Sequence, residues 1–226
     1  MTRATARRRA GGGRAAEPAA AAYAHLRGCG DPVLAALIEA LGEQRFERSP
    51  DRPPPAAHYA ALVRAIVGQQ LSTHAARAIW ARLLEHFSGH PPEPEQILAA
   101  DPEALRAAAG LSRAKVGFLR SLAEHVSSGE LDLDALGGEG DEEIVAVLTR
   151  VHGIGVWSAH MFLMFQLERP DVLPVGDLGI RRALERAYAL DALPGAAAVE
   201  AIAEPWRPHR TVACRYLWLS LANAPT

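Results

Sequence analysis

Residues 147–165 read VLTRVHGIGVWSAHMFLMF, and this stretch decides which helical fold the sequence predicts. Two glycines, Gly153 and Gly155, flank Ile154 between two runs that have the composition of helices. Glycine is favoured where a tight turn needs a positive φ, or where another chain must approach the backbone closely. The stretch therefore predicts two helices joined by a tight hairpin, with Gly155 and Val156 in the first turn of the second helix.

The hairpin has three interpretations. A dinucleotide-binding fingerprint fails, because Ser158 stands where a third glycine is needed and no strand precedes the turn. A plain turn between two helices stays open. The third interpretation is an anion site, because the first amides of a helix lack intrahelical partners and glycines let a phosphate come close. On that interpretation Gly153, Ile154, Gly155 and Val156 bind phosphate through their backbone.

Composition and charge constrain what else the chain can do. At 226 residues and 49% hydrophobic, it can bury one sizeable core or two small ones. The formal charge is −2, and residues 1–20 hold five Arg and one Glu, which leaves −6 for the rest. Backbone amides can bind the phosphates of a polyanion without a basic surface, and the affinity should then depend only weakly on salt.

Neither a disulfide framework nor a metal centre is predicted. Cys29 and Cys214 are the two cysteines and lie far apart, which argues against a zinc or iron–sulfur site. His86 and His90 have a four-residue spacing, but a glycine and a proline interrupt any helix there. The chain lacks an apolar run of membrane-spanning length and an apolar signal segment. We therefore expect a soluble, unexported protein of the cytoplasm, associated with the nucleoid if bacterial, with no membrane partner.

Helix signals follow one another along the chain, and no segment shows sustained period-two alternation. The predicted fold is all-α, with about ten short helices. Residues 1–20 are expected to form a disordered tail. Helices are expected at about 56–68 and 156–168, and others begin at capping or first-turn residues, namely Asp31-Pro32, Ser72, Asp101-Pro102, Ser112, Asp141, Asp177 and Pro208.

Five segments together resemble the helix-hairpin-helix DNA glycosylases, in particular their alkylbase branch of the DNA-3-methyladenine glycosylase II type. They are LTRVHGIGVWSAHMF (148–162), LPVGDLGIRRA (173–183), LVRAIVGQQLS (62–72), AGLSRAKVGFL (109–119) and WRPHRTVACRYLW (206–218). The hairpin alone is weak evidence for the family. The hairpin, the downstream aspartate and the GQQLS segment in this order are strong evidence. The resemblance covers roughly residues 25–223.

The resemblance implies a two-lobed all-α fold with the active cleft between the lobes. One lobe would comprise residues 60–176, including the helix–hairpin–helix at 141–168, and the other residues 21–59 with 177–226. It also implies a monomeric enzyme without a required cofactor. Its activity would be removal of alkylated purines, of the 3-methyladenine type, from double-stranded DNA by base flipping, the first step of base excision repair.

Asp177 is the catalytic residue that the resemblance implies. In the family, the aspartate at this spacing faces the deoxyribose C1′ of the extruded nucleotide, where it can stabilise oxocarbenium-like charge or activate water. The alternative is structural, because Asp177 precedes a helix that begins at Leu178, and aspartate is a common N-cap.

The resemblance also implies that Trp157, Met161 and Trp218 form the base pocket, where indole faces would attract a cationic alkylpurine by ~0.5–2 kcal/mol per contact. Met161 departs from the tyrosine of some relatives. Bifunctional relatives carry a Schiff-base lysine at the position of Trp157, so a monofunctional enzyme is expected. Lys115 is the single lysine of the chain, and we interpret it as a solvated helix residue. The alternative for large apolar residues is the core, which is the interpretation given to Trp80 and Trp206.

In the resembled enzymes, the segment at Gln69, Gln70 and Leu71 enters the minor groove and fills the gap left by the flipped base. Which of Gln70 and Leu71 is the wedge stays open, as does a purely structural loop leading to the cap Ser72.

Hairpins of this type often hold a monovalent cation, K⁺ or Na⁺, here expected on the backbone carbonyls of Thr149, Val151 and Ile154. His152 and His160 flank the hairpin and are interpreted as exposed polar residues.

Rival functions remain. A glycosylase for another lesion class would share Asp177 and differ in its pocket. A non-catalytic helix-hairpin-helix protein would bind damaged DNA without excision, and its function would survive Asp177→Asn. A helical protein-interaction scaffold would show no salt-sensitive DNA binding.

Overall fold

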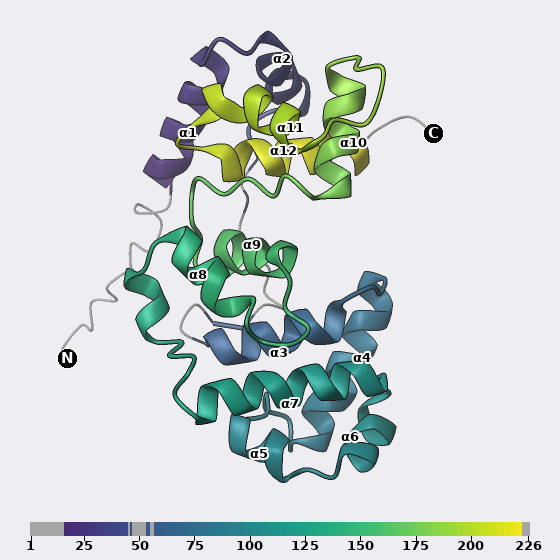
Figure 1. Cartoon of the computed structure of the whole chain (residues 1–226). Helices are drawn as coiled ribbons and strands as arrows, with labels where there is room; N and C mark the ends of the chain where they lie inside the picture. Colours follow the sequence, from purple (N-terminus) through teal and green to yellow (C-terminus); the bar gives the residue numbers. More distant parts are fainter. Residues whose placement is uncertain (1–15, 45, 47–52, 55–56, 223–226) are drawn as a thin grey trace, which may run out of the picture. The chain divides into compact units, whose positions relative to one another are not determined.

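In the computed structural model, residues 16–44, 46, 53–54 and 57–222 are described, and they contain helices and no strand (Figure 1). The predicted all-α fold is confirmed. The helices are α1 (Ala16–Gly28), α2 (Pro32–Leu41), α3 (His58–Gly68), α4 (Thr73–His86), α5 (Pro94–Ala99), α6 (Pro102–Ala109), α7 (Arg113–Ser127), α8 (Asp141–Leu148), α9 (Val156–Phe165), α10 (Leu178–Ala187), α11 (Ala196–Ala203) and α12 (Arg210–Ala222), with 3₁₀ turns η1 (Ala135–Gly138) and η2 (Glu204–Trp206). Within the described ranges, no helix is long and apolar enough to cross a membrane.

Most helices begin where the capping residues predict. Amide hydrogen bonds from the first turn of the following helix are accepted by the side chains of Asp31, Ser72, Asp101, Ser112 and Asp177. Helix α8 begins at Asp141 as expected, with Gly140 as its N-cap, whereas α12 begins at Arg210 rather than at Pro208.

Two helices depart from the prediction. The expected tail of residues 1–20 overlaps α1, which begins at Ala16; the rest of that tail lies outside the described residues. Alanine-rich sequence favours helix, and Tyr23 and Leu26 are buried, so packing stabilises α1. Helix α5 was not predicted; proline at its first position and a capping box of Glu93 with Gln96 define its start.

The chain divides into two compact units. One, here called the terminal unit, comprises Met1–Glu47 and Val175–Thr226; the other, the central unit, comprises Arg48–Pro174. The resemblance implies lobe boundaries at residues 59/60 and 176/177. Both lie further along the chain than the boundaries of the two units, at 47/48 and 174/175. Each unit is described by itself below.

In the terminal unit, α12 packs against α2 and α10, and α1 packs against α2. Trp206 is fully buried, which confirms its core interpretation, and its Nε1 donates a 2.8 Å hydrogen bond to Oδ2 of Asp31. The Tyr188 hydroxyl donates to the same oxygen, while Oδ1 caps α2. Because both carboxylate oxygens have partners, Asp31 can be buried without the usual penalty for an unsatisfied charge.

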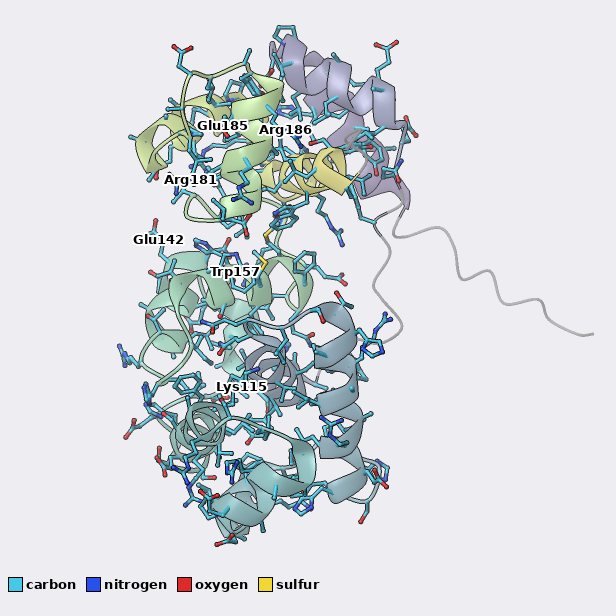
Figure 2. All side chains as sticks on the ribbon, turned by 90° about the vertical axis from the view of Figure 1, so that its right-hand side faces the viewer. Lys115, Glu142, Trp157, Arg181, Glu185 and Arg186 are labelled. Carbon is cyan, nitrogen blue, oxygen red and sulfur yellow. The ribbon has the colours of Figure 1, made fainter. Side chains whose placement is uncertain are left out.

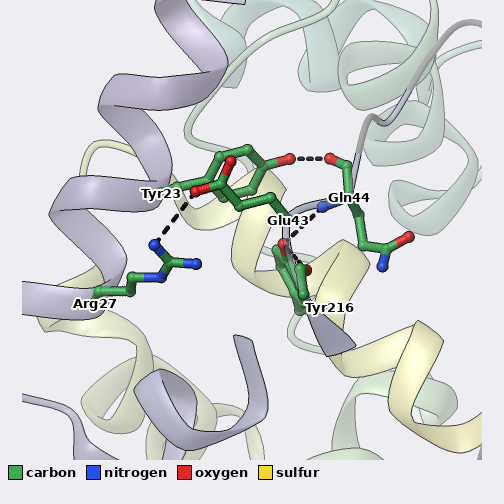
Figure 3. Close-up of polar contacts among 6 residues, drawn as sticks. Tyr23, Arg27, Glu43, Gln44 and Tyr216 are labelled. Carbon is green, nitrogen blue, oxygen red and sulfur yellow. Dashed lines mark hydrogen bonds and ion pairs between the residues drawn. The ribbon is translucent and has the colours of Figure 1, made fainter. Parts of the chain in front are cut away.

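A polar cluster fixes the segment that follows α2 (Figure 3). The hydroxyl of Tyr216 on α12 donates to the Gly42 carbonyl at 2.8 Å and accepts from the Gln44 amide at 3.1 Å. The Tyr23 hydroxyl on α1 donates to the Gln44 carbonyl. Burial and the neighbouring Tyr216 raise the pKa of Tyr23 to about 12, so this tyrosine stays protonated and remains a donor at any physiological pH.

In the central unit, α7 packs against α3, α5 and α6, and α8 packs against α9. The core includes Leu62 and Ile66 of α3 and Leu119 of α7, each at most 1% exposed. Trp80 does not join this core. It is only partly buried on α4, and the Arg64 guanidinium lies over its ring at 5.6 Å, so the core interpretation of Trp80 was wrong.

Candidate nucleic-acid interface and carboxylate site

The hairpin between α8 and α9 needs its first glycine for two independent reasons. Gly153 has a φ of +92°, which L side chains rarely adopt. A Cβ at this position would also overlap the ring of Phe118, which lies directly against the Gly153 backbone. Gly155 differs, because its φ of −94° suits any residue and a Cβ there would meet nothing within 4 Å.

The start of α9 is exposed. Gly155 is its N-cap and Val156 its first residue, so the expectation that both lie in the first turn is off by one position. No side chain caps this helix, and Val156 and Trp157 are 54% and 50% exposed. Because Gly155 has no side chain and open space beside it, an anion can approach the amides of the first turn.

A hollow of about 510 Å³ lies beside the hairpin in the central unit. It is lined by Gln69, Gln70, Phe118, Gly153, Ile154, Gly155, Trp157 and Ser158. Six of these are predicted site residues, so the structure brings the GQQLS segment together with the hairpin although they are far apart in sequence. Leu71 and Val156, also predicted, do not line the hollow. The Ile154 side chain is buried, so it serves the core and offers its backbone.

The segment Gly68–Leu71, here called the 68–71 loop, comprises the last residue of α3 and the three residues between it and Ser72, the N-cap of α4. Gln69 Nε2 donates a 2.8 Å hydrogen bond to the Gly153 carbonyl, so this side chain is attached to the hairpin and does not project from the loop. Gln70 has a φ of +57°, unusual for a residue with a side chain, and Leu71 is 38% exposed. The choice of wedge is thus between Gln70 and Leu71, as it was from the sequence.

Two residues of α7 support this region, and sequence reasoning missed both roles. Lys115 is not a solvated helix residue, because its Nζ donates a 2.7 Å hydrogen bond to the Val67 carbonyl and burial lowers its pKa. Phe118 lies under the hairpin and stacks edge-on against His152, with ring centroids 4.8 Å apart. A lysine and a phenylalanine three residues apart on one helix indicate a shared face, but not what that face contacts.

Asp177 lies in the terminal unit as the N-cap of α10, which confirms the structural alternative for this residue. Its carboxylate is buried, with the residue 8% exposed. Oδ1 accepts hydrogen bonds from the Ile180 amide at 2.8 Å and from Trp218 Nε1 at 2.9 Å. Capping does not conflict with catalysis, since these two donors hold the carboxylate in one orientation.

The three predicted pocket residues fall into two groups. Trp157 and Met161 are one turn apart on α9 in the central unit, and Figure 2 labels Trp157 there. Trp218 is on α12 in the terminal unit, partly exposed, with its indole N–H donated to Asp177. Its ring also lies close to Gly179, where a Cβ would be 3.0 Å from Trp218 Cδ1. Convergence of the two groups on one base stays a prediction.

The carbonyls expected to hold a cation lie where the hairpin begins. The Val151 carbonyl accepts a 3.0 Å hydrogen bond from the Ile154 amide, which closes the turn. The Thr149 hydroxyl donates a hydrogen bond to the Val145 carbonyl. The oxygen that Thr149 would contribute to a cation is therefore its backbone carbonyl. The described residues contain no group of three or more His, Cys, Asp or Glu side chains able to hold a metal.

The two flanking histidines differ. His152 is exposed as predicted, although its ring lies against Phe118. His160 is not an exposed polar residue; it is half-buried, and burial lowers its pKa despite the opposing effect of Asp141.

Helices, glycine hairpin and downstream aspartate define a class of DNA repair protein. Residues 63–208 match the family model described as the HhH-GPD superfamily base excision DNA repair protein, and the chain belongs to this family.

The DNA-3-methyladenine glycosylase 1 of Schizosaccharomyces pombe is 36% identical over 196 residues, which are 86% of this chain and 84% of that protein. The solved structure of the S. pombe 3-methyladenine DNA glycosylase in complex with abasic DNA has a TM-score of 0.79 at 35% identity, covering 90% of this chain and 98% of that one. The structure of a DNA-3-methyladenine glycosidase from Bacillus halodurans has a TM-score of 0.77 at 37% identity and covers 89% of each chain.

Proposed function

We propose that this protein is a monofunctional DNA glycosylase that hydrolyses the N-glycosidic bond of alkylated purines, of the 3-methyladenine type, in double-stranded DNA. It would act by base flipping in the first step of base excision repair. The observation that carries the proposal is Asp177, a buried carboxylate held by Trp218 and by the start of α10 in a chain of the HhH-GPD superfamily.

In the proposed reaction, Asp177 faces C1′ of an extruded nucleotide. The base leaves with the electron pair of the glycosidic bond, water adds its oxygen to C1′, and one water proton is released. The carboxylate stabilises the positive charge that develops at C1′ and orients or deprotonates the water. An alkylated purine already carries positive charge and leaves as a neutral base, so strong acid catalysis is not needed.

Trp157 and Lys115 support a monofunctional reaction. A Schiff base requires an amine at the sugar, and Trp157 stands at the position where bifunctional relatives carry lysine. The chain's single lysine, Lys115, donates a hydrogen bond from its Nζ to the Val67 carbonyl. The expected product is an abasic site in an intact strand. Borohydride trapping of a covalent adduct through a lysine side chain would contradict this.

Recognition of DNA would rest on the hairpin and the 68–71 loop. The exposed amides at the start of α9 would bind a backbone phosphate, and Gln70 or Leu71 would fill the space of the flipped base. The indole of Trp157, half-exposed on the same helix, offers a face for a cationic base. Because few basic side chains are involved, we expect a shallow slope of log affinity against log salt.

A monovalent cation on the carbonyls of Thr149, Val151 and Ile154 would add a positive charge between hairpin and phosphate. Replacing K⁺ and Na⁺ by a bulky organic cation at equal ionic strength should then weaken DNA binding. Equal affinity in both salts would argue against the cation.

The decisive experiment is incubation of the protein with methylated, deaminated and oxidised duplex DNA, followed by detection of free bases and of abasic sites. Release of 3-methyladenine by the wild-type protein, and its loss in Asp177→Asn, is the expected result. Release from deaminated or oxidised DNA alone would assign another lesion class. Binding to damaged DNA without release of any base would identify a non-catalytic binding protein.

A further inference from the structure

One face of α7 contacts both parts of the proposed DNA interface. Lys115, Phe118 and Ser121 follow one another at three-residue spacing on this helix. Lys115 Nζ bonds the Val67 carbonyl, and Phe118 lies against Gly153. Ser121 Oγ accepts a 3.1 Å hydrogen bond from the His152 amide. The 68–71 loop and the hairpin are therefore supported by the same rigid element.

The 68–71 loop has few bonds of its own. Besides the hydrogen bonds within α3, its backbone donates two of 3.3 Å, from Gln69 N to the Ile66 carbonyl and from Leu71 N to the Gly68 carbonyl. Gln70 between them has a positive φ. Two side-chain hydrogen bonds attach the loop to the rest of the unit: Gln69 donates to the Gly153 carbonyl and, just before the loop, Lys115 donates to the Val67 carbonyl.

The Lys115 contact meets a physical need. Carbonyls in the last turn of a helix have no intrahelical donor, and the Leu71 amide, which a continued helix would direct to Val67, bonds Gly68 instead. A cation at a helix C-terminus is also favoured by the helix dipole. Lys115 is the one lysine among the 24 Lys and Arg residues of the chain. A lysine suits a single carbonyl better than an arginine does, because its ammonium is compact and its stem is flexible.

We propose that Lys115 is a positioning residue for the 68–71 loop, fixing through the Val67 carbonyl how far the loop projects into DNA relative to the hairpin that grips the backbone. Lys115 touches no substrate in this role. The inference rests on the proposed function, because it assigns the loop to DNA insertion. Figure 2 shows Lys115 and Trp157 in the same unit, as the proposal requires.

The test compares Lys115→Met with Arg113→Met. Both remove one positive charge from the first turn of α7, but the Arg113 side chain is 82% exposed and pairs with Glu103 at the surface. We expect Lys115→Met to lower kcat on a lesion in duplex DNA about 10-fold, because a displaced loop leaves the base less often extruded. Arg113→Met should match the wild type.

Two further measurements separate positioning from general damage to the fold. On a lesion in single-stranded DNA, where no gap has to be filled, the Lys115→Met defect should shrink to within about 2-fold, whereas a fold defect would lower both rates equally. Hydrogen exchange at the Gln69 and Leu71 amides should be faster in Lys115→Met than in Arg113→Met. This last measurement needs no activity, so it tests the loop even if the proposed glycosylase function fails.

Wild-type rates and exchange in Lys115→Met would overturn the proposal. So would a salt slope reduced by about one with unchanged exchange, since that identifies a phosphate contact. If Lys115→Met does not fold, Gln69→Ala removes the other attachment of the loop. Its defect should likewise be confined to duplex DNA, and an equal defect on both substrates would overturn the proposal.

Discussion

The indole Nε1 of Trp218 donates a 2.9 Å hydrogen bond to Oδ1 of Asp177, the oxygen that also caps α10. A second indole in the same unit also bonds a capping aspartate: Trp206 Nε1 donates to Oδ2 of Asp31, whose Oδ1 caps α2. The two pairs have the same chemistry, yet only Asp177 is proposed to act on DNA. They therefore separate an effect on catalysis from an effect on stability.

Trp218→Phe keeps an aromatic ring and removes the donor. A hydrogen bond to a charged group contributes ~1.5–3 kcal/mol, so kcat should fall roughly 10- to 100-fold if the bond holds Asp177 in the reactive orientation. Trp206→Phe is the control; it should lower the Tm and leave kcat per folded molecule unchanged. Single-turnover base release and thermal unfolding measure the two effects. An unchanged kcat in Trp218→Phe would leave Trp218 as a stacking residue only.

Asp177→Asn tests the carboxylate itself. Asparagine also caps helices and its carbonyl oxygen still accepts the Ile180 and Trp218 bonds, so the fold should be retained. Losing the negative charge beside C1′ should lower base excision by at least ~10²-fold. Circular dichroism confirms folding and chromatography of released base gives the rate. Near wild-type turnover would remove Asp177 from the mechanism.

Capping chemistry and the glycine hairpin could be predicted from sequence because both are local. Asp31 was correctly expected to cap a helix, since a cap needs only its own first turn. The hydrogen bonds that Tyr188 and Trp206 donate to its carboxylate could not be predicted, because both residues lie more than 150 positions away in the sequence. For the same reason, the hydrogen bond from the Trp218 indole to Asp177 could not be predicted from the sequence.

The role of Lys115 could not be predicted for a related reason. Its partner is a backbone carbonyl, and no side-chain type at position 67 marks that carbonyl as available. Glycine was expected in this turn because a tight turn favours a positive φ, and Gly153 has one. That Phe118 fills the space of its missing side chain depends on how α7 packs, and local patterns do not carry that information.

The two hairpin glycines should respond differently to a methyl group. Gly153→Ala forces a Cβ into the Phe118 ring at a strained φ, so it should lower the free energy of unfolding by about 2 kcal/mol or more. Gly155→Ala meets open space at an ordinary φ and should fold normally. Its methyl group would lie where a phosphate approaches, so DNA affinity should fall. Urea unfolding and fluorescence anisotropy provide the measurements, and normal DNA affinity in Gly155→Ala would contradict phosphate binding at this turn.

His160 predicts a pH dependence of stability. Burial lowers its pKa in the folded protein, so the unfolded chain binds the proton more readily. The free energy of unfolding should therefore fall as pH drops below the ordinary histidine pKa of about 6.5, and the effect should be absent well above it. His160→Gln should flatten part of this loss between pH 7.5 and 5.5. Identical pH profiles for wild type and variant would contradict the assignment to His160.

Gln70→Gly should make the protein more stable, and its activity on duplex DNA tests whether Gln70 is the wedge. The positive φ of +57° at Gln70 costs a residue with a Cβ roughly 1–2 kcal/mol, which glycine does not incur. Against this stands the larger conformational entropy of glycine in the unfolded chain, so the net gain should be about 0.5–1 kcal/mol. If Gln70 is the wedge, the variant loses the side chain that fills the flipped-base gap, and excision from duplex DNA should fall while excision from single-stranded DNA does not. Leu71→Ala is the matched comparison: a larger duplex-specific loss in Leu71→Ala would assign the wedge to Leu71 and leave Gln70 as a strained turn residue.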